Sequence, residues 1–124
     1  MARTGKLAPD VKSDWLDDLI ARTTHVGLSS ADPFSVADPL TVEPVNGVYH
    51  RSAVEWTKDG SLLRNTTALV WPGLPVGAIV TWYVGWTAYA NGTPTFACPT
   101  PLLSFPNGGG FEVPPLAFYV GFAA

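Results

Sequence analysis

The stretch GAIVTWYVGWTAY, residues 77–89, decides the fold class of this 124-residue chain. Alternate residues of an extended strand share a face. One face would take Val80, Trp82, Val84, Trp86 and Ala88, and the other Thr81, Tyr83, Gly85 and Thr87. Residues of these types favour strands, and neither face carries a charge. The stretch therefore predicts a β-strand with at least one covered face.

Similar short segments precede and follow this stretch, separated by Pro, Gly, Asn and Asp. Asp59-Gly60 and Asn91-Gly92 favour hairpin turns, because glycine accepts a positive φ. The predicted strands are residues 24–29, 40–43, 47–57, 62–71, 77–89, 94–98 and 115–122. We expect an all-β fold, an antiparallel β-sandwich, Ig-like or jelly-roll-like, of about seven to eight strands. Residues 106–110 are expected to form a loop, and the last strand would place Leu116, Phe118, Val120 and Phe122 on one face.

The N-terminal part of the sequence follows a different pattern. Residues 1–12 lack apolar periodicity and are expected to form an extended arm. Ser13 is a suitable N-cap for a short helix over residues 14–22, with acidic residues in its first turns and an apolar stripe behind them. The predicted domain organisation is an arm over residues 1–12 and a single β-sandwich domain over residues 13–124, which includes this helix.

Charged residues are scarce, at 14% of the chain against a typical share of about 25%. None lies between Arg64 and Glu112, and the net charge is −3. The absence of a basic cluster argues against nucleic-acid binding. Residues 68–90 are long enough to span a bilayer, but Pro72 and Pro75 would interrupt such a helix. We expect neither a nucleic-acid partner nor a membrane span.

Candidate residues for chemistry are few and isolated. His25 and His50 have no carboxylate or cysteine at metal-ligand spacing. Cys98 has no neighbouring positive charge to activate it, and no serine lies in a nucleophile-elbow motif. Asp14, Asp17 and Asp18 suit the helix dipole better than a calcium site. The sequence therefore predicts a protein that is not an enzyme, with no catalytic residues, metal or cofactor.

A surface poor in charge and rich in aromatic residues is typical of protein interfaces. An unusually large core is the alternative explanation. A third is sugar binding by Trp56, Trp82 and Trp86, although core packing is the usual role of such strand residues. The side chains expected at an interface are Leu7, Pro9, Trp15, Trp71, Tyr83, Tyr89 and Phe111.

Three segments carry a family resemblance: GVYHRSAVEW at 47–56, RNTTALVWP at 64–72 and IVTWYVGW at 79–86. Together with Ser30-Ala31-Asp32-Pro33 they resemble a family of small virion proteins of actinobacterial phages, over about residues 14–122. Val48, inserted between Gly47 and Tyr49, departs from commoner members.

The resemblance implies a β-sandwich component of the virion, assembled in the host cytoplasm. The first expectation is a capsid decoration or minor capsid protein that binds the major capsid protein or other virion proteins. It would act as a homo-oligomer, with a trimer as one form. A minor tail or tail-fibre-associated protein is the alternative, and a carbohydrate-binding adhesin module is the third.

Overall fold

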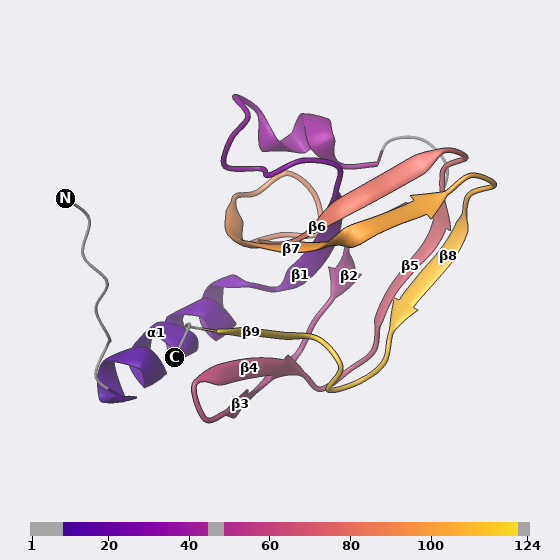
Figure 1. Cartoon of the computed structure of the whole chain (residues 1–124). Helices are drawn as coiled ribbons and strands as arrows, with labels where there is room; N and C mark the ends of the chain where they lie inside the picture. Colours follow the sequence, from indigo (N-terminus) through magenta and orange to yellow (C-terminus); the bar gives the residue numbers. More distant parts are fainter. Residues whose placement is uncertain (1–8, 45–48, 122–124) are drawn as a thin grey trace.

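The computed structural model describes residues 9–44 and 49–121, with side chains from Ser13 onward. Its strands pair antiparallel throughout and form three sheets (Figure 1). The largest contains, in spatial order, β2 (Ser52–Ala53), β1 (His25–Ser29), β6 (Ala78–Trp86) and β7 (Pro94–Phe105). The second contains β3 (Trp56–Asp59), β4 (Leu62–Asn65) and β9 (Tyr119–Gly121), and the third β5 (Leu69–Leu74) and β8 (Gly109–Val113).

The sheets enclose one apolar core. In Figure 1 the β6–β7 hairpin lies above β9, β4 and β3, while β5 and β8 run along one side. The predicted all-β, antiparallel, sandwich-like fold is therefore confirmed. None of the helices in the described part of the chain is long and apolar enough to cross a membrane.

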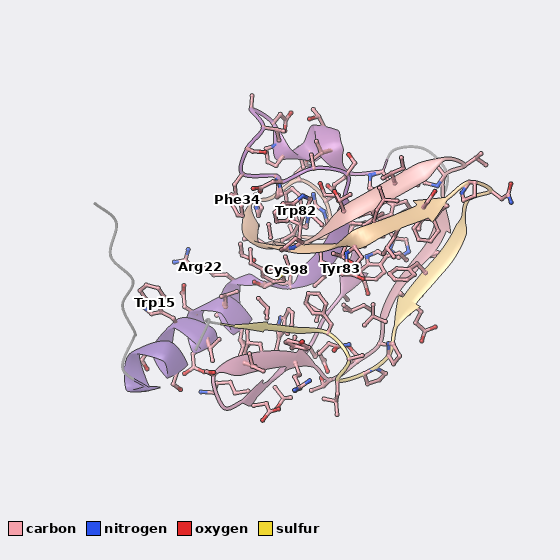
Figure 2. All side chains as sticks on the ribbon, in the orientation of Figure 1. Trp15, Arg22, Phe34, Trp82, Tyr83 and Cys98 are labelled. Carbon is pink, nitrogen blue, oxygen red and sulfur yellow. The ribbon has the colours of Figure 1, made fainter. Side chains whose placement is uncertain are left out.

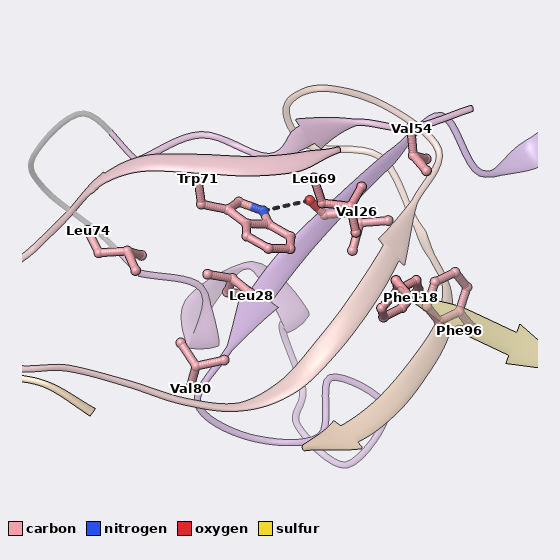
Figure 3. Packing of buried hydrophobic residues seen from close by; sticks show 9 residues of the cluster. All are labelled: Val26, Leu28, Val54, Leu69, Trp71, Leu74, Val80, Phe96 and Phe118. Atoms are coloured by element: carbon pink, nitrogen blue, oxygen red, sulfur yellow. Dashed lines mark hydrogen bonds between the residues drawn. The ribbon is translucent and has the colours of Figure 1, made fainter. Parts of the chain in front are cut away.

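Trp71 lies in the middle of the core, fully buried (Figure 3). Its indole Nε1 donates a hydrogen bond of 3.0 Å to the carbonyl of Val26, which links β5 to β1. Phe111 of β8 stacks on its ring, with centroids 5.7 Å apart and planes 14° apart. The other buried members of the core are Val26, Leu28, Val54, Leu69, Leu74, Val80, Phe96 and Phe118.

The strand β6 departs from simple alternation. Its pairing with β7 shifts between Val80 and Trp82, where two residue steps on β6 face four on β7. The two ends of β6 present residues of opposite parity to the core. Val80 belongs to the core, and Tyr83 packs against it. Trp86 instead lies near Gly27, on the opposite face of the sheet from Val26 and Leu28. The prediction that Val80 shares a face with Trp86 is therefore wrong, and the change of face falls in the part of β6 where the pairing with β7 is irregular.

The helix α1 (Pro9–Arg22) begins before the predicted cap at Ser13. Proline suits the first position of a helix, because its missing N–H would have no partner there. The expected extended arm is therefore wrong for residues 9–12, and residues 1–8 lie outside the described residues. Two of the aspartates form ion pairs: Asp17 with Lys58 of β3 at 2.8 Å, and Asp18 with Arg22 at 3.0 Å.

Several predicted strands have different bounds. Residues 40–43 were expected to be extended, but a 3-10 helix, η1 (Pro39–Val42), forms instead because the Asp38 side chain accepts a hydrogen bond from the Leu40 amide. Residues 47–57 contain only β2 and the start of β3, with residues 47–48 outside the described residues. Residues 62–71 divide into β4 and β5, and β7 runs well beyond residue 98.

The C-terminal prediction is also corrected. Residues 109–110 open β8 rather than belonging to a loop, because they pair with β5. The last strand is shorter than predicted, and Leu116 precedes it in a turn with a φ of 66°, exposed to solvent. Phe118 and Val120 do face the core as predicted, whereas Phe122 lies outside the described residues. Both predicted glycine turns form, with positive φ at Gly60 and Gly92.

Candidate interaction surfaces

The far end of the β6–β7 hairpin exposes aliphatic side chains. Its inward residues, Val80 and Leu103 among them, pack on the core, so alternation turns Ile79 and Leu102 outward. Ile79 is 48% exposed and Leu102 64% exposed, and Val76 in the preceding turn is 78% exposed. We call these three residues the hairpin face.

The hairpin face lies within the uncharged part of the sequence. Beside it is a shallow cavity of about 280 Å³, lined by Ser30, Val42, Glu43, Pro44, Pro75, Val76, Gly77, Ala78 and Ile79. The strands beneath are anchored by the core, so the exposed side chains stand on a rigid support. Such a surface is suited to contact with another apolar surface.

On the outer side of β1, a buried ion pair joins the loop after η1 to the start of β2. Arg51, 3% exposed, donates from Nε to Oε2 of Glu43 at 3.0 Å and from Nη2 to Oε1 at 2.6 Å. Its Nη1 donates to the carbonyls of Ala88 and Asn91, at 2.9 and 2.6 Å. The guanidinium carbon also lies 3.6 Å from the ring centre of Trp86.

Tyr49 completes this polar cluster. Its hydroxyl donates to Glu43 Oε2 at 3.1 Å and accepts from the Leu28 amide at 3.0 Å. Burial, and then the negative charge of Glu43, raises the pKa of Tyr49 well above its usual range. The phenol is thus kept neutral, and the cluster fastens the loop before β2 to β1.

Tyr89 projects from the loop that Arg51 holds. Its ring is 56% exposed and lies 5.7 Å, centre to centre, from both His25 and His50. His50 Nδ1 lies 3.0 Å from the Arg51 carbonyl, which can only accept, so Nδ1 carries the proton when the ring is neutral. A cavity of about 310 Å³ lies beside these rings. We call it the Tyr89 cavity; its walls are Leu40, Glu43, Pro44, Tyr49, His50, Arg51, Tyr89, Ala90 and Asn91.

The expected interface residues do not come together in one place. Tyr89 and Trp15 are exposed, and Trp15 stands on α1, at the opposite end of the molecule from β5 and β8 (Figure 2). The prediction is wrong for Trp71, which the core encloses. Tyr83 and Phe111 are partly buried against that core. Leu7 and the side chain of Pro9 lie outside the described residues.

Two of the three tryptophans proposed for sugar binding have other roles. Trp86 is fully buried beneath Arg51. Trp56 packs against the core and donates from Nε1 to the Thr23 carbonyl at 3.1 Å. Trp82 is partly buried on β6. For Trp56 and Trp86, the packed alternative is therefore the correct one.

Of the candidates for chemistry, His25 and His50 both come to lie beside Tyr89. Cys98 is partly buried, and burial raises the pKa of its thiol, which opposes thiolate formation. Among residues 9–44 and 49–121, no three His, Cys, Asp or Glu side chains gather in a possible metal site. Two of the surfaces that the described residues form are candidates for binding: the hairpin face and the Tyr89 cavity.

Sequence reasoning missed the residues that build both surfaces. Val76, Ile79 and Leu102 gave no signal, because outward aliphatic residues on a strand resemble inward ones. Arg51 and Glu43 each lie in a segment predicted as a strand, but nothing in their spacing along the sequence indicates that they pair.

Comparison with known proteins adds no relative: no protein-family model, no curated protein and no solved structure matches this chain.

Proposed function

We propose that this chain is a structural protein of a bacteriophage particle, a capsid decoration or minor capsid protein that binds the major capsid protein through the hairpin face. The observation that carries the proposal is the exposure of Val76, Ile79 and Leu102 on a rigid, uncharged hairpin. The segments that resemble actinobacterial phage virion proteins support the identity of the partner. The role requires binding alone and no catalytic group.

The energetics of such a contact are favourable. Burying apolar surface stabilises a contact by about 25 cal/mol per Å². Desolvating a charged group would oppose it, and the uncharged hairpin face has none to desolvate. The core fixes the hairpin before binding, which limits the entropy lost on association. A homo-oligomer, such as a trimer, would present several hairpin faces at once and so raise the avidity for the shell.

Binding to separated parts of the particle tests the proposal. Purified protein is incubated with heads and with detached tails of the phage that encodes it, and bound protein is measured after sedimentation. We expect binding to heads. The double variant Ile79→Thr/Leu102→Thr should bind at least about tenfold more weakly, a loss of about 1.4 kcal/mol.

Val70→Thr is the matched control, because Val70 is an exposed aliphatic residue of β5, outside the hairpin face. This variant should bind like the unchanged protein. Binding to tails alone would overturn the capsid assignment in favour of a minor tail or tail-fibre-associated protein. Undiminished head binding by the double variant would overturn the role of the hairpin face.

A further inference from the structure

We propose that the Tyr89 cavity binds one neutral sugar ring, with Tyr89 as the stacking surface. This inference goes beyond particle assembly and depends on a different set of side chains. It rests on four properties of the cavity: an exposed aromatic ring, a rigid loop that holds it, balanced charge, and polar groups that have no hydrogen-bond partner among residues 9–44 and 49–121.

The aromatic ring is both exposed and supported. Tyr89 leaves more than half of its surface open, at 56%. His25 meets it edge-on, with ring planes 76° apart, and His50 lies tilted by 32°. An amphipathic ring of this kind offers an apolar surface to the C–H groups of a ligand and a polar hydroxyl at its edge.

The loop that carries Tyr89 is fixed before any ligand arrives. Arg51 donates hydrogen bonds to the carbonyls of Ala88 and Asn91, which lie before and after Tyr89 in the sequence. Thr87 and Thr93 close the loop, since the Thr87 amide donates to the Thr93 carbonyl at 3.1 Å and the Thr93 amide to Thr87 Oγ1 at 2.9 Å. A preformed stacking surface binds without the cost of ordering a loop.

Charge in the cavity wall is balanced, which selects for a neutral ligand. The two Glu43 oxygens receive the Nε and Nη2 donors of Arg51, and Nη1 is used by two carbonyls. Four of the five guanidinium N–H groups are therefore engaged. An anion would find its counter-charge already neutralised by Glu43, and a cation would find the carboxylate neutralised by Arg51.

Three polar groups around the ring are available to hydroxyl groups. His50 Nε2 is an acceptor when Nδ1 carries the proton for the Arg51 carbonyl. Among the described residues, this nitrogen, the Tyr89 hydroxyl and the Asn91 side-chain amide have no hydrogen-bond partner. They combine acceptors and donors, as the hydroxyl groups of a sugar require.

The volume limits the ligand to a single ring. The cavity holds about 310 Å³, near the lower end of the range of roughly 300–1,000 Å³ for small-molecule sites. It is shallow and largely open to solvent, so the affinity expected is in the millimolar range, a binding free energy of about −4 kcal/mol. A longer glycan would add contacts outside the cavity.

Titration by NMR tests this proposal. The ¹⁵N-labelled protein is titrated with glucose, galactose, mannose and N-acetylglucosamine, and with glucuronate as a charged analogue. We expect at least one neutral sugar to shift the amide resonances of residues 49–51 and 87–91 with a millimolar Kd. Glucuronate should bind at least about tenfold more weakly than glucose or not at all.

Two tyrosine variants make the test specific. Tyr89→Ala should weaken sugar binding at least about tenfold. Tyr119→Ala should leave it unchanged, because Tyr119 has nearly the same exposure, 58%, but lies on β9. The Ile79→Thr/Leu102→Thr variant should also bind sugar normally, which separates this proposal from the one on particle assembly.

The proposal is overturned by any of three results. The first is that no sugar shifts the amide resonances. The second is an equal loss of sugar affinity in Tyr89→Ala and Tyr119→Ala. The third is binding of glucuronate as tight as that of glucose. Unchanged thermal unfolding of the variants shows that a loss of binding is not a loss of fold.

Discussion

Arg51 and Glu43 are joined by two hydrogen bonds, of 3.0 and 2.6 Å, in a place where the arginine is almost completely buried. The pair ties three segments together: the loop after η1, the start of β2 and the loop after β6. It supports both candidate surfaces, because Glu43 lines the cavity beside the hairpin face as well as the Tyr89 cavity. Its integrity is therefore a condition of the proposed sugar site, because Arg51 also holds the loop that carries Tyr89.

Removing one member of this pair should destabilise the protein strongly. Arg51→Met leaves the Glu43 carboxylate buried without its counter-charge and the carbonyls of Ala88 and Asn91 without a donor. We expect a loss of about 3–5 kcal/mol in the free energy of unfolding, measured in urea. Arg22→Met is the control, because the Arg22–Asp18 pair is exposed and should contribute less than about 1 kcal/mol. Equal effects of the two substitutions would contradict the role of the buried pair.

Gly27 should tolerate no side chain. A Cβ there would lie 3.0 Å from the Tyr49 hydroxyl and 3.1 Å from both Glu43 Oε2 and Trp86 Nε1. These groups are packed together, so Gly27→Ala should cost about 1–3 kcal/mol by overpacking. Gly110→Ala on β8 is the matched control, because the nearest atom to its Cβ would be the Trp71 carbonyl oxygen at 3.9 Å. A Gly27→Ala variant as stable as the unchanged protein would show that the side chains of Tyr49, Glu43 and Trp86 can move to accept the extra methyl group without loss of stability.

Acid should weaken the protein through His25. Burial, then the positive charge of Arg51 and of His50, lowers the pKa of His25 below its ordinary value of 6.5. The unfolded chain therefore binds a proton at His25 more tightly than the folded protein does. The contribution of neutral His25 to the free energy of unfolding is fully present above pH 6.5 and is lost as the pH falls through the lowered pKa. His25→Gln should reduce the loss of stability between about pH 7 and about pH 5, measured from urea midpoints. An identical slope in the variant would contradict this assignment.

The sequence predicted the features that depend on neighbouring residues, and it failed for those that depend on contacts between distant segments. The strand predicted over residues 77–89 forms over Ala78–Trp86, and Asp59-Gly60 and Asn91-Gly92 predicted their turns, because alternation and positive φ are local properties. The bulge after Val80 was not predictable, since it depends on pairing with β7. The same limit explains β8, whose glycines pair only because β5 lies beside them.

The candidate surfaces were less predictable than the fold. Tyr89 was identified as a surface residue, and it is exposed. Trp71 was not distinguishable from it by composition, because both are aromatic residues in uncharged segments. Only the tertiary structure shows that Trp71 donates to the Val26 carbonyl inside the core. Likewise, the sequence does not indicate that Arg51 binds the loop of Tyr89, because the two are far apart along the chain.

Asn65 should be among the residues least tolerant of substitution. Its side chain is fully buried, donates to the carbonyls of Thr67 and Pro114 at 2.8 and 3.0 Å, and accepts from the Phe118 amide at 2.9 Å. Asn65→Ala leaves these three backbone groups without a partner, and each such group costs about 1–3 kcal/mol. We expect a loss of at least about 3 kcal/mol, measured by urea unfolding.

Asn65→Asp and Asn107→Ala make that prediction sharper. The aspartate still accepts from the Phe118 amide but faces two carbonyls with no donor, so it should also destabilise the protein. Asn107 lies exposed in the β7–β8 turn, and its removal should change the free energy of unfolding by less than about 0.5 kcal/mol. Hydrogen exchange gives a local measure: the Phe118 amide should lose protection in Asn65→Ala and keep it in Asn107→Ala. Retained protection in Asn65→Ala would mean that the segment before β9 is held in place without Asn65.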